Sequence, residues 1–267
     1  MRMLRLDVLV LVLASMLLMP EPSRAAPAAQ EIGVVVMHGK GGRPESLVDV
    51  LAKALEQEGF LVASIEMPWS GARNYDVDLN AGVGEVTRAL DGLRQRGARQ
   101  VFVAGHSQGG IFALLYGGLH RVDGIAAIAP GGQVDVPVYL KTLGRHVAEA
   151  RRMVADGQGR VVADFADYEG SRGTSGVRTS AAIYLSWFDP DGVLTSRVFG
   201  RVPAGVPVLY VSPTRDYPGL VKMRQANFGA LPPNPLTRLH EPDSDHRNAP
   251  GAAAPGVIKW IREVAGF

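Results

Sequence analysis

Short apolar runs alternate along this chain with segments of helical periodicity. The first run, Ile32 to Met37 (IGVVVM), is rich in β-branched residues and has no charged position. Such a run is typical of a strand buried on both faces of a parallel sheet. The following segment places Leu47, Leu51 and Leu55 on one face at helical spacing. Strands that alternate with helices predict an α/β protein, in which helices cover both faces of a parallel sheet.

The same alternation continues to the end of the chain, with one interruption. The further strands expected are Phe60–Ile65, Gln100–Ala104, Gly124–Ala129, Val206–Val211 and Leu236–His240. Between Pro130 and Pro207 there are helical pieces, Tyr139–Val154 and Arg178–Trp187, but no evident sheet strand. We therefore expect a sheet of about six mostly parallel strands, with residues 131–205 inserted over one end of it.

The N-terminal segment has the pattern of an export signal. Arg2 and Arg5 precede an unbroken apolar or small run from Val8 to Met19, and small residues flank Arg24 where a signal peptidase would cleave. We predict a signal peptide over residues 1–25 and a mature domain over residues 26–267. The protein is then exported, periplasmic or secreted, with no stable membrane span after cleavage; an uncleaved anchor is the alternative.

Composition removes several classes of function. The net charge is only +2 and no long basic run occurs, so nothing indicates nucleic acid as a partner. The chain contains no cysteine, which excludes disulfides, a thiol nucleophile and thiolate metal sites. His, Asp and Glu do not cluster at metal-ligand spacing. The sequence predicts no metal and no cofactor.

A serine flanked by glycines follows the third expected strand directly. In VFVAGHSQGG, Ser107 lies between Gly105 and Gly109, where the strand must turn sharply into a helix. A residue at the apex of that turn projects above the sheet, and the residues two before and two after it must be small. This is the G-x-S-x-G arrangement of a nucleophile elbow.

Candidates for the oxyanion hole, the acid and the base that a serine nucleophile needs follow three further expected strands. The first strand ends in HGKGG, so the backbone N–H groups of Lys40 and Gln108 are candidates for an oxyanion hole. Asp216 follows the fifth expected strand and His246 follows the sixth. Because the carboxyl ends of parallel strands meet at one edge of a sheet, these residues should gather there.

In these motifs the sequence resembles the α/β-hydrolase superfamily, in its serine esterase and lipase branch. The resemblance covers nearly all of the mature chain. It implies Ser107 as nucleophile, His246 as base, Asp216 as acid, and the insertion as a cap or lid. We do not expect the two antiparallel strands that open the full family fold, because only the short segment from Ala26 to Glu31 precedes the HGKGG strand in the expected mature chain. The resemblance therefore implies a minimal α/β-hydrolase. The expected function is hydrolysis of a small-molecule or lipid-like carboxylic ester through an acyl-enzyme.

Several alternatives remain open from the sequence. An amidase or peptidase, a thioesterase or an acyltransferase could use the same triad, and a binding protein could keep the scaffold without catalysis. The acid could instead be Asp189 or Asp191 in the insertion. Trp69 and Tyr75 are candidates for the substrate pocket, although packing against the insertion would also explain them.

Overall fold

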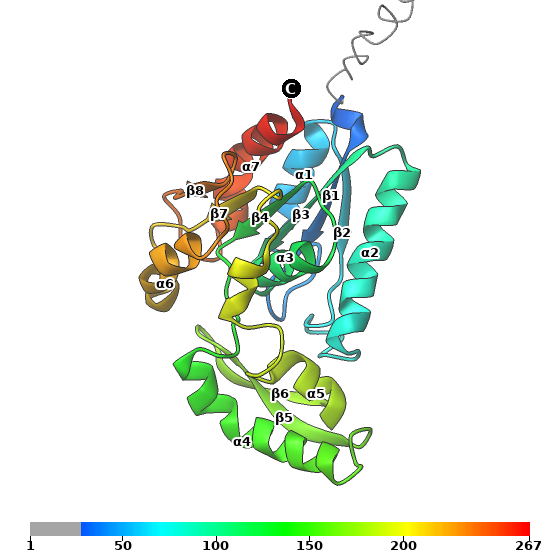
Figure 1. Ribbon diagram of the computed structural model, residues 1–267, viewed down its shortest axis with the longest axis vertical. Helices are drawn as coiled ribbons and strands as arrows, with labels where there is room; N and C mark the ends of the chain where they lie inside the picture. Colours follow the sequence, from blue (N-terminus) through cyan, green and yellow to red (C-terminus); the bar gives the residue numbers. More distant parts are fainter. Residues whose placement is uncertain (1–27) are drawn as a thin grey trace, which may run out of the picture.

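A computed structural model describes residues 28–267 of the chain (Figure 1). The expected signal peptide over residues 1–25 therefore lies outside the described residues. Across residues 28–267, no helix combines the length and the apolar character needed to cross a membrane.

A six-stranded sheet forms the centre of the molecule, in the order β2-β1-β3-β4-β7-β8, and every neighbouring pair is parallel. The strands are β1 (Ile32–Met37), β2 (Leu61–Ile65), β3 (Gln100–His106), β4 (Gly124–Ile128), β7 (Val208–Val211) and β8 (Arg238–His240). The prediction of an α/β-hydrolase fold with six parallel strands is confirmed.

Helices cover both faces of this sheet because the side chains of each strand alternate between two cores. Val34 and Val36 of β1 belong to the core beneath α1 and α7, whereas Val35 and Met37 belong to the core beneath α2 and α3. All six residues of β1 are buried, which explains its continuous apolar sequence. The four helices span Asp49–Gln57 (α1), Leu79–Gln95 (α2), Gln108–Leu119 (α3) and Ala249–Ala265 (α7).

The insertion contains a two-stranded antiparallel hairpin that the sequence analysis did not predict. It consists of β5 (Val162–Glu169) and β6 (Gly173–Ser180), between α4 (Pro137–Ala155) and α5 (Ala181–Phe188). The hairpin carries few buried apolar residues, chiefly Phe165 and Val177, so it has no apolar run that predicts a strand. The start of the expected helix Arg178–Trp187 belongs to β6 instead. A short 3-10 helix, η2 (Ser196–Arg201), precedes β7.

A further helix, α6 (Pro218–Gly229), lies between β7 and β8 and was also not predicted. Its only buried residue is Asn227, so it has no apolar stripe.

Figure 1 shows the hairpin, α4 and α5 together beyond one end of the sheet, joined to it by the segments that follow β4 and precede β7. The insertion thus lies at the end of the sheet where the candidate residues gather.

Candidate active site

Ser107 occupies a strained backbone position between β3 and α3. Its φ of 55° and ψ of −115° lie in a region that non-glycine residues rarely adopt. Hydrogen bonds fix the turn, since Ser107 N–H donates to Ile128 O (2.9 Å) and Gly131 N–H donates to Ser107 O (3.2 Å). The structure therefore holds this serine at an apex above the sheet, as the motif predicts.

The glycines that flank the serine are required by close backbone approach. A Cβ on Gly105 would collide with the carbonyl oxygen of Gly109, and a Cβ on Gly109 would lie 2.5 Å from Met37 O. A side chain at either position would push α3 away from β3 or β1. This explains why the segment before and after the apex carries glycine.

Parallel pairing that continues beyond β7 and β8 brings Asp216 to His246. Thr214 N–H donates to Pro242 O (3.0 Å) and Arg215 N–H donates to Ser244 O (2.9 Å). The loops after the two strands thus run side by side, and each delivers one polar side chain to the same point.

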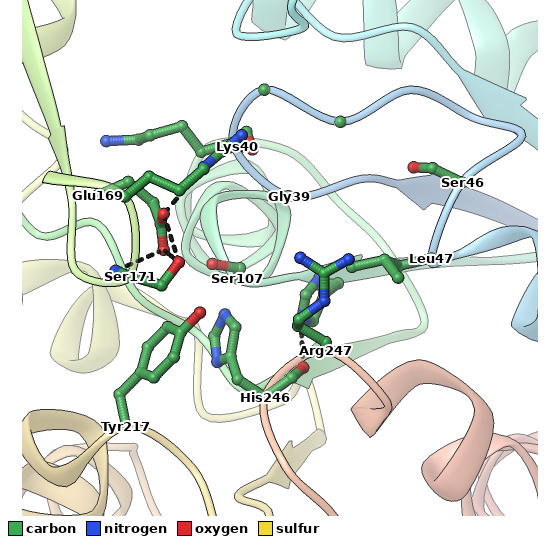
Figure 2. Close-up of a pocket in the computed structure, with 14 residues that line it drawn as sticks. Gly39, Lys40, Ser46, Leu47, Ser107, Glu169, Ser171, Tyr217, His246 and Arg247 are labelled. Atoms are coloured by element: carbon green, nitrogen blue, oxygen red, sulfur yellow. Dashed lines mark hydrogen bonds and ion pairs between the residues drawn. The ribbon is translucent and has the colours of Figure 1, made fainter. Parts of the chain in front are cut away.

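His246 and Asp216 form a buried hydrogen-bonded pair. The Nδ1 atom of His246 lies 2.7 Å from Asp216 Oδ1, and the same oxygen accepts the Tyr217 N–H at 2.7 Å. Because a carboxylate only accepts, Nδ1 carries the proton and Nε2 has a free lone pair. The Tyr217 ring stacks on the imidazole at a centroid distance of 4.3 Å. Figure 2 shows the His246 ring directed toward the Ser107 hydroxyl.

The two alternative acids lie elsewhere. Asp189 and Asp191 both form ion pairs with Arg151 of α4. Neither contacts His246 in the described residues, so of the three candidates the structure brings only Asp216 to this histidine.

His106 supports the loop that carries His246. Its Nε2–H donates to the His246 carbonyl oxygen at 2.8 Å, and the two rings lie 4.8 Å apart. Burial lowers the pKa of His106 to about 3, and the nearby His246 imidazole acts in the same direction. The side chain is therefore neutral at neutral and mildly acidic pH.

This burial predicts that His106 makes the fold less stable in mild acid. Below pH 6.5 His106 is protonated in the unfolded chain but stays neutral in the native protein. The contribution of His106 to the free energy of unfolding therefore falls by about 1.4 kcal/mol per pH unit toward pH 3. Urea unfolding of wild type and His106→Gln between pH 5 and about 7 should show a shallower pH slope in the variant. The matched control is His120→Gln at an exposed position. Equal slopes in wild type and His106→Gln would contradict the prediction.

The HGKGG loop passes directly beside the serine. A Cβ on Gly39 would lie 3.2 Å from Ser107 Cβ. His38 anchors the loop, since its Nδ1–H donates to Gly39 O (2.8 Å) and its Nε2 accepts the Met67 N–H (3.0 Å). Gln108 is the first residue of α3, where N–H groups have no acceptor within the helix. The backbones of Lys40 and Gln108 thus flank Ser107 from two sides.

The side chain of Lys40 connects this loop to the insertion. Its ammonium group lies 2.6 Å from Asp167 Oδ1 and donates to Tyr139 OH (2.9 Å) and Tyr168 O (3.0 Å). Asp167 also accepts the Tyr75 hydroxyl at 2.7 Å. Burial alone lowers the pKa of Lys40, but the charge and hydrogen bond of Asp167 outweigh it and raise the pKa above its ordinary value. All three ammonium protons have acceptors on the insertion.

We predict that the Lys40–Asp167 pair couples the insertion to the sheet energetically. Lys40→Met or Asp167→Asn leaves one buried partner unmatched and should each lower the free energy of unfolding by about 3–5 kcal/mol. The double variant should lose clearly less than the sum of the two. Urea unfolding measures all four proteins. Lys53→Met, which breaks an exposed pair with Asp49, is the control and should change little. Additive losses would show that the pair is not coupled.

Ser107 and His246 line a cleft with two arms. The apolar arm, of about 320 Å³, contains Val136, Val138, Leu220 and Met223 beside Tyr139 and Tyr168. The charged arm, of about 200 Å³, contains Lys40, Glu169, Arg172 and Arg247 beside Ser46 and Leu47. The two arms share Ser107, Lys40, Glu169, Tyr217 and His246.

The structure corrects the expectation that Trp69 and Tyr75 line the substrate pocket. Both are almost fully buried and pack edge-on against Trp187 of α5. The Tyr75 hydroxyl is bound to Asp167. Neither residue lines an arm of the cleft that contains Ser107; they lie beside a separate hollow next to Lys40. They fasten the insertion to the core.

Several residues of the cleft were missed by sequence reasoning. Tyr217 follows Asp216 directly, and Arg247 follows His246, so adjacency to the candidate triad was an available signal for both. Glu169 and Arg172 belong to the unpredicted hairpin turn, and no local pattern links them to Ser107. Within residues 28–267, no group of three or more His, Asp or Glu side chains could hold a metal ion.

The family model described as "Serine aminopeptidase, S33" matches residues 29–178, more than half of the chain. The chain belongs to this family. It is thereby a member of the α/β-hydrolase superfamily, and the matched region includes the HGKGG loop, the elbow and most of the hairpin. No curated protein sequence matches this hydrolase.

Solved structures with the same fold include several esterases and lipases. One is described with the metagenome-derived lipolytic enzymes LipS and LipT (18% identity, TM-score 0.59, covering 91% of this chain and 99% of that one). Est1E from Butyrivibrio proteoclasticus, with bound ferulic acid, has 15% identity, a TM-score of 0.60, and coverage of 88% and 90%. A monoacylglycerol lipase from Paleococcus ferrophilus has 19% identity, a TM-score of 0.57, and coverage of 87% and 94%. At these identities the likeness establishes the fold.

Proposed function

We propose that this hydrolase is an exported serine esterase that cleaves carboxylic esters. The observation that carries the proposal is the His246 Nδ1–Asp216 Oδ1 hydrogen bond of 2.7 Å, at a cleft whose floor is Ser107 on a strained elbow. A serine, a histidine with a free Nε2 and a carboxylate that orients it are the groups that acyl transfer requires.

In the proposed mechanism, His246 takes the proton of the Ser107 hydroxyl as its oxygen attacks the ester carbonyl carbon. The Asp216 carboxylate holds the imidazole in the reactive tautomer and stabilises its protonated form. Backbone N–H groups of Lys40 and Gln108 donate to the oxyanion, aided by the N-terminus of α3. His246 then protonates the leaving alcohol, and in the second half-reaction it activates the water that releases the acid.

The two arms suggest how an ester is held across Ser107. The apolar arm suits an apolar half of the ester, since Val136, Leu220 and Met223 offer no hydrogen bonds. The charged arm suits a polar half. Export rests on residues 1–25 alone, and its test is the cell fraction in which the full chain is found and the N-terminal residue of the mature protein.

A peptidase is the second candidate, because the family description names an aminopeptidase. An aminopeptidase needs a carboxylate that receives the substrate's ammonium group. Glu169 is the carboxylate of the cleft, but it already accepts hydrogen bonds from Ser171 and Arg172. This arrangement favours the esterase.

The test is a panel of p-nitrophenyl esters of graded acyl length, beside aminoacyl p-nitroanilides and acyl thioesters. We expect the purified mature protein to hydrolyse the esters with the highest kcat/KM. Faster turnover of aminoacyl anilides would identify a peptidase instead. Turnover of none of the three classes would leave the proposal without support.

A further inference from the structure

The charged arm of the cleft contains four ionised side chains, and three of them are neutralised within the protein. Lys40 pairs with Asp167 at 2.6 Å. Arg172 pairs with Glu169 at 3.0 Å and also donates to Lys40 O at 2.8 Å. Lys40 is thus neutralised by a residue outside the arm and Arg172 by one within it, and the contacts of both hold the hairpin against the HGKGG loop.

Arg247 is the fourth, and it has no such partner. Among the ion pairs of the described residues, Lys40, Arg172 and Arg215 each have a carboxylate partner, whereas Arg247 has none. The acids nearest to it in sequence are engaged elsewhere. Asp245 accepts from Asn248 N–H (2.8 Å), and Asp243 is paired with Arg215.

The position of Arg247 places its charge at the reacting centre. It follows His246 directly, and it lines the charged arm together with Ser46, Leu47 and Ser107. Figure 2 shows its guanidinium group extended over the cleft between Ser107 and Leu47. The guanidinium fork presents up to five N–H donors, a geometry that matches the two oxygens of a carboxylate or phosphate.

We infer that Arg247 binds an anionic group, a carboxylate or a phosphate, on the half of the ester that occupies the charged arm. The inference rests on the proposed esterase function and deepens it by naming the substrate class. The preferred ester then has one apolar half, for the arm lined by Leu220 and Met223, and one half that carries a negative charge close to the ester bond.

The experiment compares matched neutral and anionic esters in wild type and Arg247→Gln. Phenyl butyrate and para-carboxyphenyl butyrate differ by a carboxylate on the alcohol half, whereas p-nitrophenyl butyrate and p-nitrophenyl hemisuccinate differ on the acyl half. In wild type, one anionic ester should exceed its neutral partner in kcat/KM. That ratio should fall about tenfold in Arg247→Gln, mainly through KM. The pair that responds shows which half the charged arm receives.

Three further measurements separate a specific contact from a general effect of charge. Arg247→Lys keeps the charge but loses the fork, so its ratio should lie between the other two. Arg121→Gln removes the same charge at an exposed position outside both arms and should keep the wild-type ratio. Added NaCl should lower the wild-type ratio and leave that of Arg247→Gln unchanged.

The possible failures are distinguishable. If the protein hydrolyses neutral esters but both ratios are the same in wild type and Arg247→Gln, the inference about Arg247 is wrong and the esterase proposal stands. If no ester of either pair is hydrolysed, the proposed function fails and the inference fails with it.

Discussion

Replacing Ser107 with alanine is expected to lower kcat/KM for the best ester of the panel by at least about 10⁴-fold, because it removes the hydroxyl toward which the His246 imidazole is directed. The fold should survive, since the strained turn is held by backbone hydrogen bonds and by the close contact of Gly105 with Gly109. The melting temperature should therefore stay within about 2 °C of wild type. Initial rates and thermal melts measure the two effects separately.

A fluorophosphonate probe identifies the nucleophile independently of the substrate. Peptide mass spectrometry should locate the label on Ser107, and Ser107→Ala should not be labelled. Ser46 and Ser171, which also line the charged arm, are the competing serines. Ser171→Ala should still be labelled. A label on Ser171, or turnover retained in Ser107→Ala, would show that the nucleophile has been misassigned.

The central sheet and the positions around it could be predicted because their signals are local. The run from Ile32 to Met37 is buried on both faces, and its uninterrupted apolar composition indicates that burial directly. The elbow is likewise a local motif, because Ser107 and both glycines stand within five consecutive residues, although the backbone that Gly109 must approach belongs to the distant strand β1. Once the strands are placed, the topology of a parallel sheet brings Asp216 and His246 to the same edge.

The insertion could not be predicted to the same degree because its stability comes from distant contacts. Lys40 and Asp167 lie 127 residues apart, and no local sequence pattern at either residue predicts their contact. Few positions of the hairpin are buried, so its strands lack the apolar runs that identify β1 and β3. For Trp69 and Tyr75, aromatic residues in a loop near the site were compatible with lining the substrate pocket or with packing against the insertion. The structure favours packing, because both rings contact Trp187 of the insertion.

Asp216→Asn is expected to lower kcat by about 10⁴-fold while leaving the fold intact. The physical reason is the tautomer of His246. In the native pair Asp216 Oδ1 accepts the Nδ1 proton, which leaves Nε2 free to act as base toward Ser107. An asparagine can present its amide N–H to Nδ1, which transfers the imidazole proton to Nε2 and removes the base. The substitution keeps the size of the side chain, so the packing beneath Tyr217 should persist.

Asp189→Asn and Asp191→Asn are the matched controls, because both residues are aspartates that the sequence alone left as candidate acids. Each contacts Arg151 on the insertion; Asp191 is exposed to solvent and Asp189 is half-buried. Breaking an exposed ion pair costs little, up to about 1 kcal/mol, and should leave kcat within about twofold of wild type. The measurements are kcat on the best ester and a thermal melt for each variant.

If Asp216→Asn keeps most of its kcat while one of the controls loses it with an unchanged melt, then the acid lies in the insertion. The Asp216–His246 hydrogen bond would in that case be structural, and the loop after β7 would serve to hold His246 in place rather than to set its tautomer.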